Sequence, residues 1–147
     1  MKLKIGLAVA ALSVAFVGVQ AQGGAKPTDP QIAHIAYTAG QIDNEAAQQA
    51  LKMSKNADVR AFAENMVKDH TAVNRMALDL CKKLGVTPED NDTSKGLKAG
   101  GEKNVASLKT LKGAAFDKAY VDHEVAYHQA VLDAVDKTLI PSASNAD

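Results

Sequence analysis

The chain has a single cysteine, no tryptophan, and only three tyrosines and three phenylalanines among its 147 residues. Because Cys81 has no second cysteine to pair with, an intramolecular disulfide is excluded, and the thiol is expected to pack as a small apolar group. No long β-branched run and no Asn-Gly hairpin signal occurs, so strands are not expected. The sequence therefore predicts an all-α protein.

Motifs for several common activities are also missing. There is no Gly-x-Ser-x-Gly, no His-Glu-x-x-His and no glycine-rich phosphate loop, so no catalytic nucleophile is indicated. The 17 basic and 17 acidic side chains balance, and no basic patch predicts binding to nucleic acid. These absences favour a protein without enzymatic activity, although an unfamiliar active site stays open.

The N-terminal residues 1–21 have the pattern of a secretory signal peptide. Basic Lys2 and Lys4 precede an apolar run that is too short for a membrane span and ends at Ala21. Residues 22–28 form a Gly, Ala and Pro linker, and Gln22 stands where a lipoprotein would have cysteine. We expect an exported protein, periplasmic or secreted, with no stable membrane span after cleavage.

Residues 29–147 are predicted to form one helical bundle domain. Apolar residues recur at three- and four-residue spacing, which is typical of amphipathic helices packed against one another. Asp29 is expected to cap the first helix, Asn56 to cap the second, Gly85 to end the second and Pro141 to stop the last. The expected helices cover residues 29–53, 56–84 and 116–139, with a weaker crossover helix over residues 97–111.

Two histidines fall on the apolar seams of these helices. His70 lies on the seam of the second helix and His128 on that of the last helix. Glu124 precedes His128 by one turn and Glu45 borders the stripe of the first helix. Asp69 flanks His70 and is expected to lie next to the ligands without binding the metal itself. Imidazoles and carboxylates turned into a bundle are ligands for iron, copper, zinc or manganese, so His70, His128, Glu124 and Glu45 form a candidate metal site.

The alternative is that each seam histidine is packed at the core edge and hydrogen-bonded to a neighbouring Asp, Glu or Tyr, with no cofactor. The di-iron helical bundles place a glutamate three residues before each ligand histidine, and here Val67 and Val125 occupy those positions. A ferroxidase-type centre is therefore disfavoured. His34 and His123 are expected on solvated faces.

Several motifs in these helices are specific enough to indicate a family. They are Phe62-Ala63, Met66, Asp69-His70, the Phe116-Asp117 start of the last helix and His128, with Glu45 at the matching place in the first helix. Through them residues 29–147 resemble the domain-of-unknown-function 4142 family. The resemblance implies an exported bacterial protein with a ferritin-like up-down bundle, and no established activity.

Members of that family usually continue into a further helix, whereas this sequence stops at Asp147. We therefore expect a bundle that lacks its last core helix and is C-terminally incomplete, with an apolar groove filled by a homodimer partner or a helix-donating partner. The leading hypothesis is an envelope protein with a binding or structural role. The alternative is a metal-binding or redox and stress-defence protein.

Overall fold

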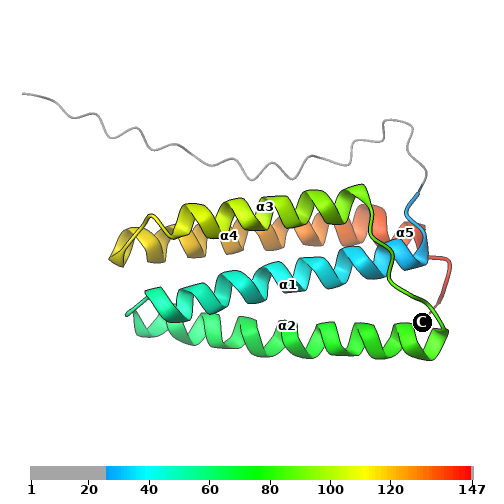
Figure 1. The fold of residues 1–147 in the computed structure, drawn as a ribbon, viewed down its shortest axis with the longest axis horizontal. Helices are drawn as coiled ribbons and strands as arrows, with labels where there is room; N and C mark the ends of the chain where they lie inside the picture. The colour runs from blue at the N-terminus through cyan, green and yellow to red at the C-terminus, as the bar shows by residue number, and fades with distance from the viewer. Residues whose placement is uncertain (1–25, 147) are drawn as a thin grey trace, which may run out of the picture.

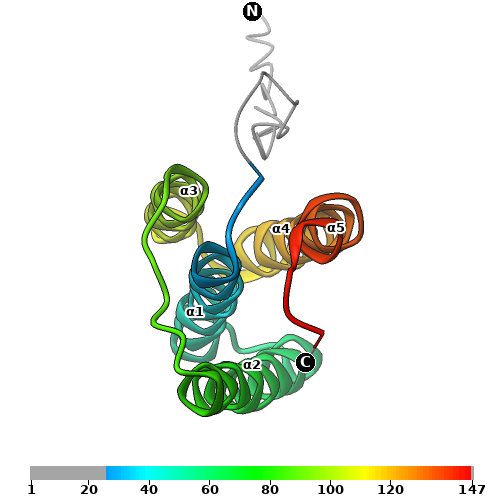
Figure 2. The ribbon, with the colours of Figure 1, turned by 90° about the vertical axis from the view of Figure 1, so that its right-hand side faces the viewer.

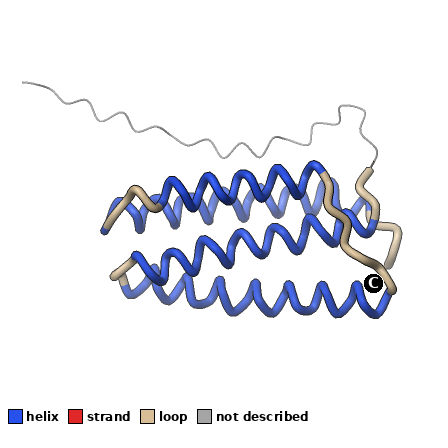
Figure 3. The backbone as a smooth tube through the Cα atoms, in the orientation of Figure 1, coloured by secondary structure: helices blue, strands red, loops and turns tan. Residues whose placement is uncertain are grey.

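A computed structural model describes residues 26–146, so the expected signal peptide and most of the linker lie outside the described part of the chain. The helices are α1 (Asp29–Met53), α2 (Ala57–Leu84), α3 (Asp92–Leu108) and α4 (Gly113–Ala134), followed by the π-helical turn η1 (Val135–Leu139) and the short α5 (Ile140–Ser142). No strand occurs between residues 26 and 146, which confirms the all-α prediction (Figure 3). None of the described helices is long and apolar enough to cross a membrane.

The four long helices lie side by side, and successive helices run in opposite directions (Figure 1). Helix α1 is central and packs against α2, α3 and α4 (Figure 2). The backbones of α2 and α4 lie farther apart, and these two helices meet through long side chains such as Phe62 and Tyr120, whose ring centroids are 6.0 Å apart. The expected crossover segment is a helix of 17 residues, α3, that packs along α1. Gly101 of α3 allows a close approach, because a Cβ atom there would lie 2.8 Å from Cγ1 of Ile42.

Helix boundaries follow local capping interactions. The Asn56 side chain accepts hydrogen bonds from the backbone N–H groups of Asp58 and Val59, at 2.9 and 3.2 Å, and so caps α2 as expected. Gly85 ends α2 with φ +66°, a left-handed conformation that favours glycine. The prediction that Asp29 caps α1 is wrong by one residue, because Thr28 is the N-cap and Asp29 is already helical.

The prediction that Pro141 stops the last helix is wrong, since helical structure continues to Ser142. Proline has no backbone N–H and its ring crowds the carbonyl four residues earlier. The π-helical turn η1, directly before α5, changes the hydrogen-bond register so that the chain can pass through Pro141 in a helical conformation. Beyond it, the Ser144 backbone N–H donates to the Asp29 carboxylate at 2.8 Å.

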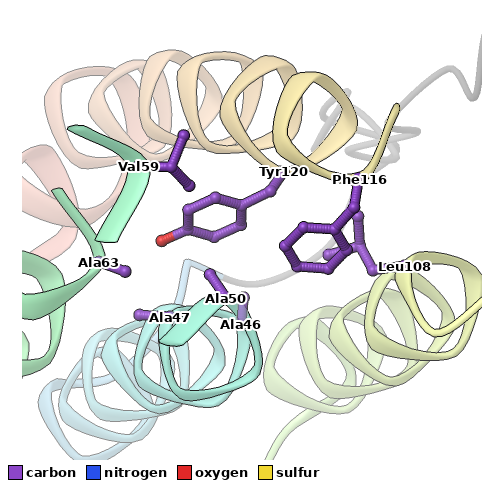
Figure 4. Close-up of a cluster of buried hydrophobic side chains, with 8 residues drawn as sticks. All are labelled: Ala46, Ala47, Ala50, Val59, Ala63, Leu108, Phe116 and Tyr120. Carbon is purple, nitrogen blue, oxygen red and sulfur yellow. The ribbon is translucent and has the colours of Figure 1, made fainter. Parts of the chain in front are cut away.

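The hydrophobic core consists of two clusters spaced along the bundle. The larger cluster contains small alanines of α1, which let Phe116 and Tyr120 of α4 reach α1 and α2 (Figure 4). The smaller cluster joins Ala39 and Ile42 of α1 to Tyr127 of α4. Between the two apolar clusters, short stretches of α1 and α4 carry polar side chains.

The expected apolar seams of α2 and α4 are only partly buried. Val125 is 67% exposed, Leu132 57% and Val73 55%, whereas Glu124 and Tyr127 on the neighbouring face of α4 are buried. The reason is that α4 turns its buried face toward α1, and no described helix covers the side between α2 and α4. We call this side the α2/α4 face; its residues are His70 and Val73 of α2 and Val121, Val125, His128 and Leu132 of α4.

Candidate metal centre

Two buried carboxyl groups lie between the two core clusters. Asp43 follows Ile42 on the inner face of α1 and is 3% exposed, and Glu124 lies one turn beyond Tyr120 on the inner face of α4 and is 1% exposed. No hydrogen-bond donor of the described residues reaches Oδ1 of Asp43 or either carboxylate oxygen of Glu124. The nearest groups that could carry a positive charge are histidines: Nδ1 of His123 lies 3.7 Å from Oε1 of Glu124, and Nδ1 of His128 lies 3.9 Å from Oε2. A buried carboxylate without a counter-charge is strongly destabilising, so this pair requires a protonated histidine, a bound cation or a proton of its own.

Two imidazoles meet beside these carboxyl groups. Nε2 of His70 lies 3.4 Å from Oδ2 of Asp43, and the rings of His70 and His128 are 5.6 Å apart between centroids. The side chains of His70 and His128 are 22% and 37% exposed, so both border the α2/α4 face. Ligand atoms of Asp43, His70 and His128 all lie within 4.8 Å of one another.

The hydrogen bond of His128 fixes which ring nitrogen is free. Nδ1 of His128 lies 2.8 Å from the backbone carbonyl oxygen of Glu124 and donates its hydrogen to it. Histidines that bind metals commonly donate their other ring N–H to a backbone carbonyl in this way. Nε2 of His128 therefore keeps its lone pair, as a metal ligand requires.

Burial and charge shift the protonation equilibria of the cluster. Burial, followed by repulsion from Glu124, raises the pKa of Asp43 to about 8. Burial, followed by the charge of His128, lowers the pKa of His70 and favours its neutral form. Without a metal ion the folded protein thus keeps a proton on the carboxyl pair and leaves His70 neutral.

Buried aromatic side chains surround the cluster. His123 stacks on Tyr127 at 5.8 Å between ring centroids, and its Nδ1 accepts a hydrogen bond of 3.2 Å from the Asn104 amide. Its side chain is 14% exposed, so the prediction of a solvated His123 is wrong: α3 supplies Asn104 and covers it. Burial, then the charge of Asp43 and that of Glu124, raises the pKa of Tyr127, whose hydroxyl donates to the Ala39 carbonyl.

The structure brings together three of the four predicted ligands. His70, His128 and Glu124 meet as expected, but Glu45 is exposed and lies outside the cluster. Two residues along a helix correspond to about 200° around its axis, so Glu45 points away from the side occupied by Asp43. Asp69 is exposed next to His70 and acts on it only through its charge, which is the smallest of the influences on the His70 pKa.

Asp43 is the cluster residue that the sequence-based reasoning missed. The sequence does indicate that Asp43 faces inward, because Asp43 stands four residues after Ala39 and four before Ala47, on the small-residue face of α1. A lone aspartate on such a face must be paired, protonated or bound to a cation when another helix covers it. The surrounding alanines are the feature that distinguishes it from Glu45.

Comparison with known proteins identifies the family but no characterised relative. No curated protein and no solved structure matches the chain. A family model described as "Domain of unknown function (DUF4142)" matches residues 16–147, which cover the whole bundle including the cluster residues. The chain therefore belongs to the DUF4142 family of domains of unknown function.

Proposed function

We propose that this protein binds one divalent transition-metal ion between α1, α2 and α4, with Asp43, His70 and His128 as ligands. The observation that carries the proposal is the buried pair Asp43 and Glu124, which lies against two imidazoles. Oδ1 of Asp43 and both carboxylate oxygens of Glu124 lack a hydrogen-bond donor among the described residues. Glu124 contributes the second negative charge next to the ion. The charge of the site and the types of its donor atoms both favour a divalent transition metal.

The charges match a divalent cation. Asp43 and Glu124 together carry two negative charges when ionised, so a divalent ion would leave the buried site neutral. Mixed imidazole and carboxylate donors suit zinc, copper, iron or manganese better than magnesium or calcium, which prefer oxygen donors. His70 must be neutral and Asp43 ionised to bind, so the lowered pKa of His70 favours metal loading, whereas the raised pKa of Asp43 means that loading releases a proton.

The distances are also compatible with a metal ion. With bonds of about 2.1 Å, tetrahedral ligands lie about 3.4 Å from one another. The separation of 3.4 Å between Nε2 of His70 and Oδ2 of Asp43 already has this value. The ligand atoms of all three side chains lie within 4.8 Å of one another, so small movements of the partly exposed imidazole rings would bring them to bonding distance.

Elemental analysis tests this proposal. The protein is purified without chelator and without a metal-binding tag, then incubated with iron, copper, zinc or manganese. We expect about one metal atom per chain for wild type and little for His70→Ala or Asp43→Asn. His34→Ala is the matched control, because His34 lies on α1 next to Asp90 and outside the cluster. A metal content near zero with all four ions would refute the proposal.

A binding bundle without metal is the second candidate function. The exposed apolar side chains of the α2/α4 face, Val73, Val125 and Leu132, favour it, because such patches often mark protein interfaces. The occupant would be a second copy or a helix from a partner, which would complete a ferritin-like bundle. This candidate predicts a dimer by light scattering, converted to monomer by Val125→Asp, together with no bound metal.

Export is a further part of the proposal. The basic and apolar N-terminal residues 1–21 support a signal peptide and a periplasmic or secreted location. A metal site in that location would suit metal storage or stress defence. Fractionation of cells that produce the full chain tests it, and retention of an uncleaved protein in the cytoplasm would contradict it.

A further inference from the structure

The ligands of the proposed metal site leave one side of the site uncovered. Asp43 of α1 lies at the buried end of the site, and His70 and His128 reach the site from α2 and α4. No described helix lies over the side between α2 and α4, and only the short segment after α5 runs from α5 toward α2 (Figure 2). An ion bound there would be enclosed by protein on the α1 side and accessible from the α2/α4 face.

The surroundings of this open side are apolar. Val125 and Leu132 stand one turn before and one turn after His128, and Val73 stands one turn after His70. All three are more than half exposed. A molecule that approaches the ion from the α2/α4 face therefore contacts aliphatic side chains next to the metal.

The charge of the site favours a neutral external ligand over an anionic one. Asp43 and Glu124 already balance a divalent ion, and the exposed carboxylate of Asp69 adds negative charge next to His70. An anionic ligand would add charge to a site that is already neutral or negative. A neutral donor avoids this repulsion, and an imidazole-type nitrogen suits the same transition metals as the two histidines of the site.

We propose that the metal bound by Asp43, His70 and His128 keeps one coordination position directed at the α2/α4 face, and that this position binds a neutral nitrogen donor with an apolar body. The chemical class is that of substituted imidazoles and related heteroaromatic bases. The inference rests on the proposed function. It adds an exchangeable ligand position and the chemistry of the ligand that occupies it.

The test uses the full chain loaded with Co²⁺, whose visible absorption changes when its ligands change. The probes are imidazole, 4-phenylimidazole and azide. We expect imidazole to change the spectrum, azide to bind more weakly, and 4-phenylimidazole to bind about tenfold more tightly than imidazole, since part of its phenyl ring is removed from water. Val125→Ser should reduce the advantage of 4-phenylimidazole to about threefold or less without changing the Co²⁺ content.

Leu78→Ser is the matched control. Leu78 is also a large exposed apolar residue of α2, but it lines a separate pocket with Tyr37 and Arg75. Its substitution should leave the preference for 4-phenylimidazole unchanged. Equal effects of Leu78→Ser and Val125→Ser would overturn the assignment of the apolar contact to the α2/α4 face.

The remaining outcomes separate this inference from the proposed function. If no Co²⁺ binds, the proposed function itself fails. If Co²⁺ binds but imidazole leaves its spectrum unchanged, the metal site stands and the open position is refuted. Tighter binding of azide than of imidazole would refute the neutral donor, and a dimer that excludes all three probes would refute access through this face.

Discussion

Replacement of Asp43 by asparagine should change how the stability of the metal-free protein depends on pH. The folded protein raises the pKa of this carboxyl group from 3.8 to about 8, because Asp43 is buried next to Glu124. Between these values the folded state binds a proton that the unfolded state has released. The stabilisation by this proton is therefore complete below about pH 4 and is lost as the pH rises through about 8.

The size of the effect follows from the pKa difference. Each unit of difference corresponds to about 1.4 kcal/mol, so Asp43 lowers the free energy of unfolding by on the order of 5 kcal/mol between about pH 4 and pH 8. This is a large part of the roughly 5–15 kcal/mol that stabilises a typical domain. Asparagine has nearly the same shape and does not titrate, so Asp43→Asn should lack this loss.

The assay is urea unfolding in EDTA, followed by far-UV circular dichroism at several pH values. The free energy of unfolding of Asp43→Asn minus that of wild type should increase with pH. His70 acts in the opposite direction, because its lowered pKa destabilises the folded state at acidic pH, but it is present in both proteins. Parallel pH curves for the two proteins would show that Asp43 is not held in its protonated form.

Three further substitutions test the fold and the core. Gly101→Ala should destabilise the protein by about 1–3 kcal/mol, because its Cβ atom would meet Ile42. Gly100→Ala has open space on the same helix and should stabilise the protein by up to about 1 kcal/mol. Equal effects of the two substitutions in thermal unfolding would contradict the close contact between α1 and α3. Asn56→Ala should lower stability by about 1 kcal/mol in urea unfolding through loss of the α2 cap, and no loss would argue against the cap. Tyr120→Phe should leave the melting temperature unchanged or raise it, since the buried hydroxyl has no hydrogen-bond partner among the described residues; a large drop would reveal a partner.

The helices could be predicted from the sequence because their signals are local. Asn56 caps α2 through backbone groups two and three residues away, and Gly85 ends it because glycine readily adopts a left-handed conformation. The spacing of apolar residues then indicates which segments are amphipathic. The errors are shifts of helix ends that depend on neighbouring turns. They concern the cap at Asp29, the stop at Pro141, the expected crossover helix over residues 97–111, which is α3 (Asp92–Leu108), and the last helix, which begins at Gly113 and not at residue 116.

The membership of the candidate site was predicted only in part. His70, His128 and Glu124 were identified because helical spacing places each on or beside an apolar seam. Glu45 and Asp43 are two residues apart on α1, and the spacing of apolar residues on α1 does not show which of the two carboxylates is buried. That choice depends on which side of α1 is covered by α4.

The helical class, the helical segments and the apolar face of each helix follow from the sequence alone, because backbone hydrogen bonds and capping act within a few residues. The packing of the helices is needed to bring Asp43 together with His70 and His128, to place His123 under Asn104 and to leave Val125 exposed. These features need the packing because burial depends on which helices lie next to one another. An amphipathic pattern shows that a helix has an apolar face, but not what covers it.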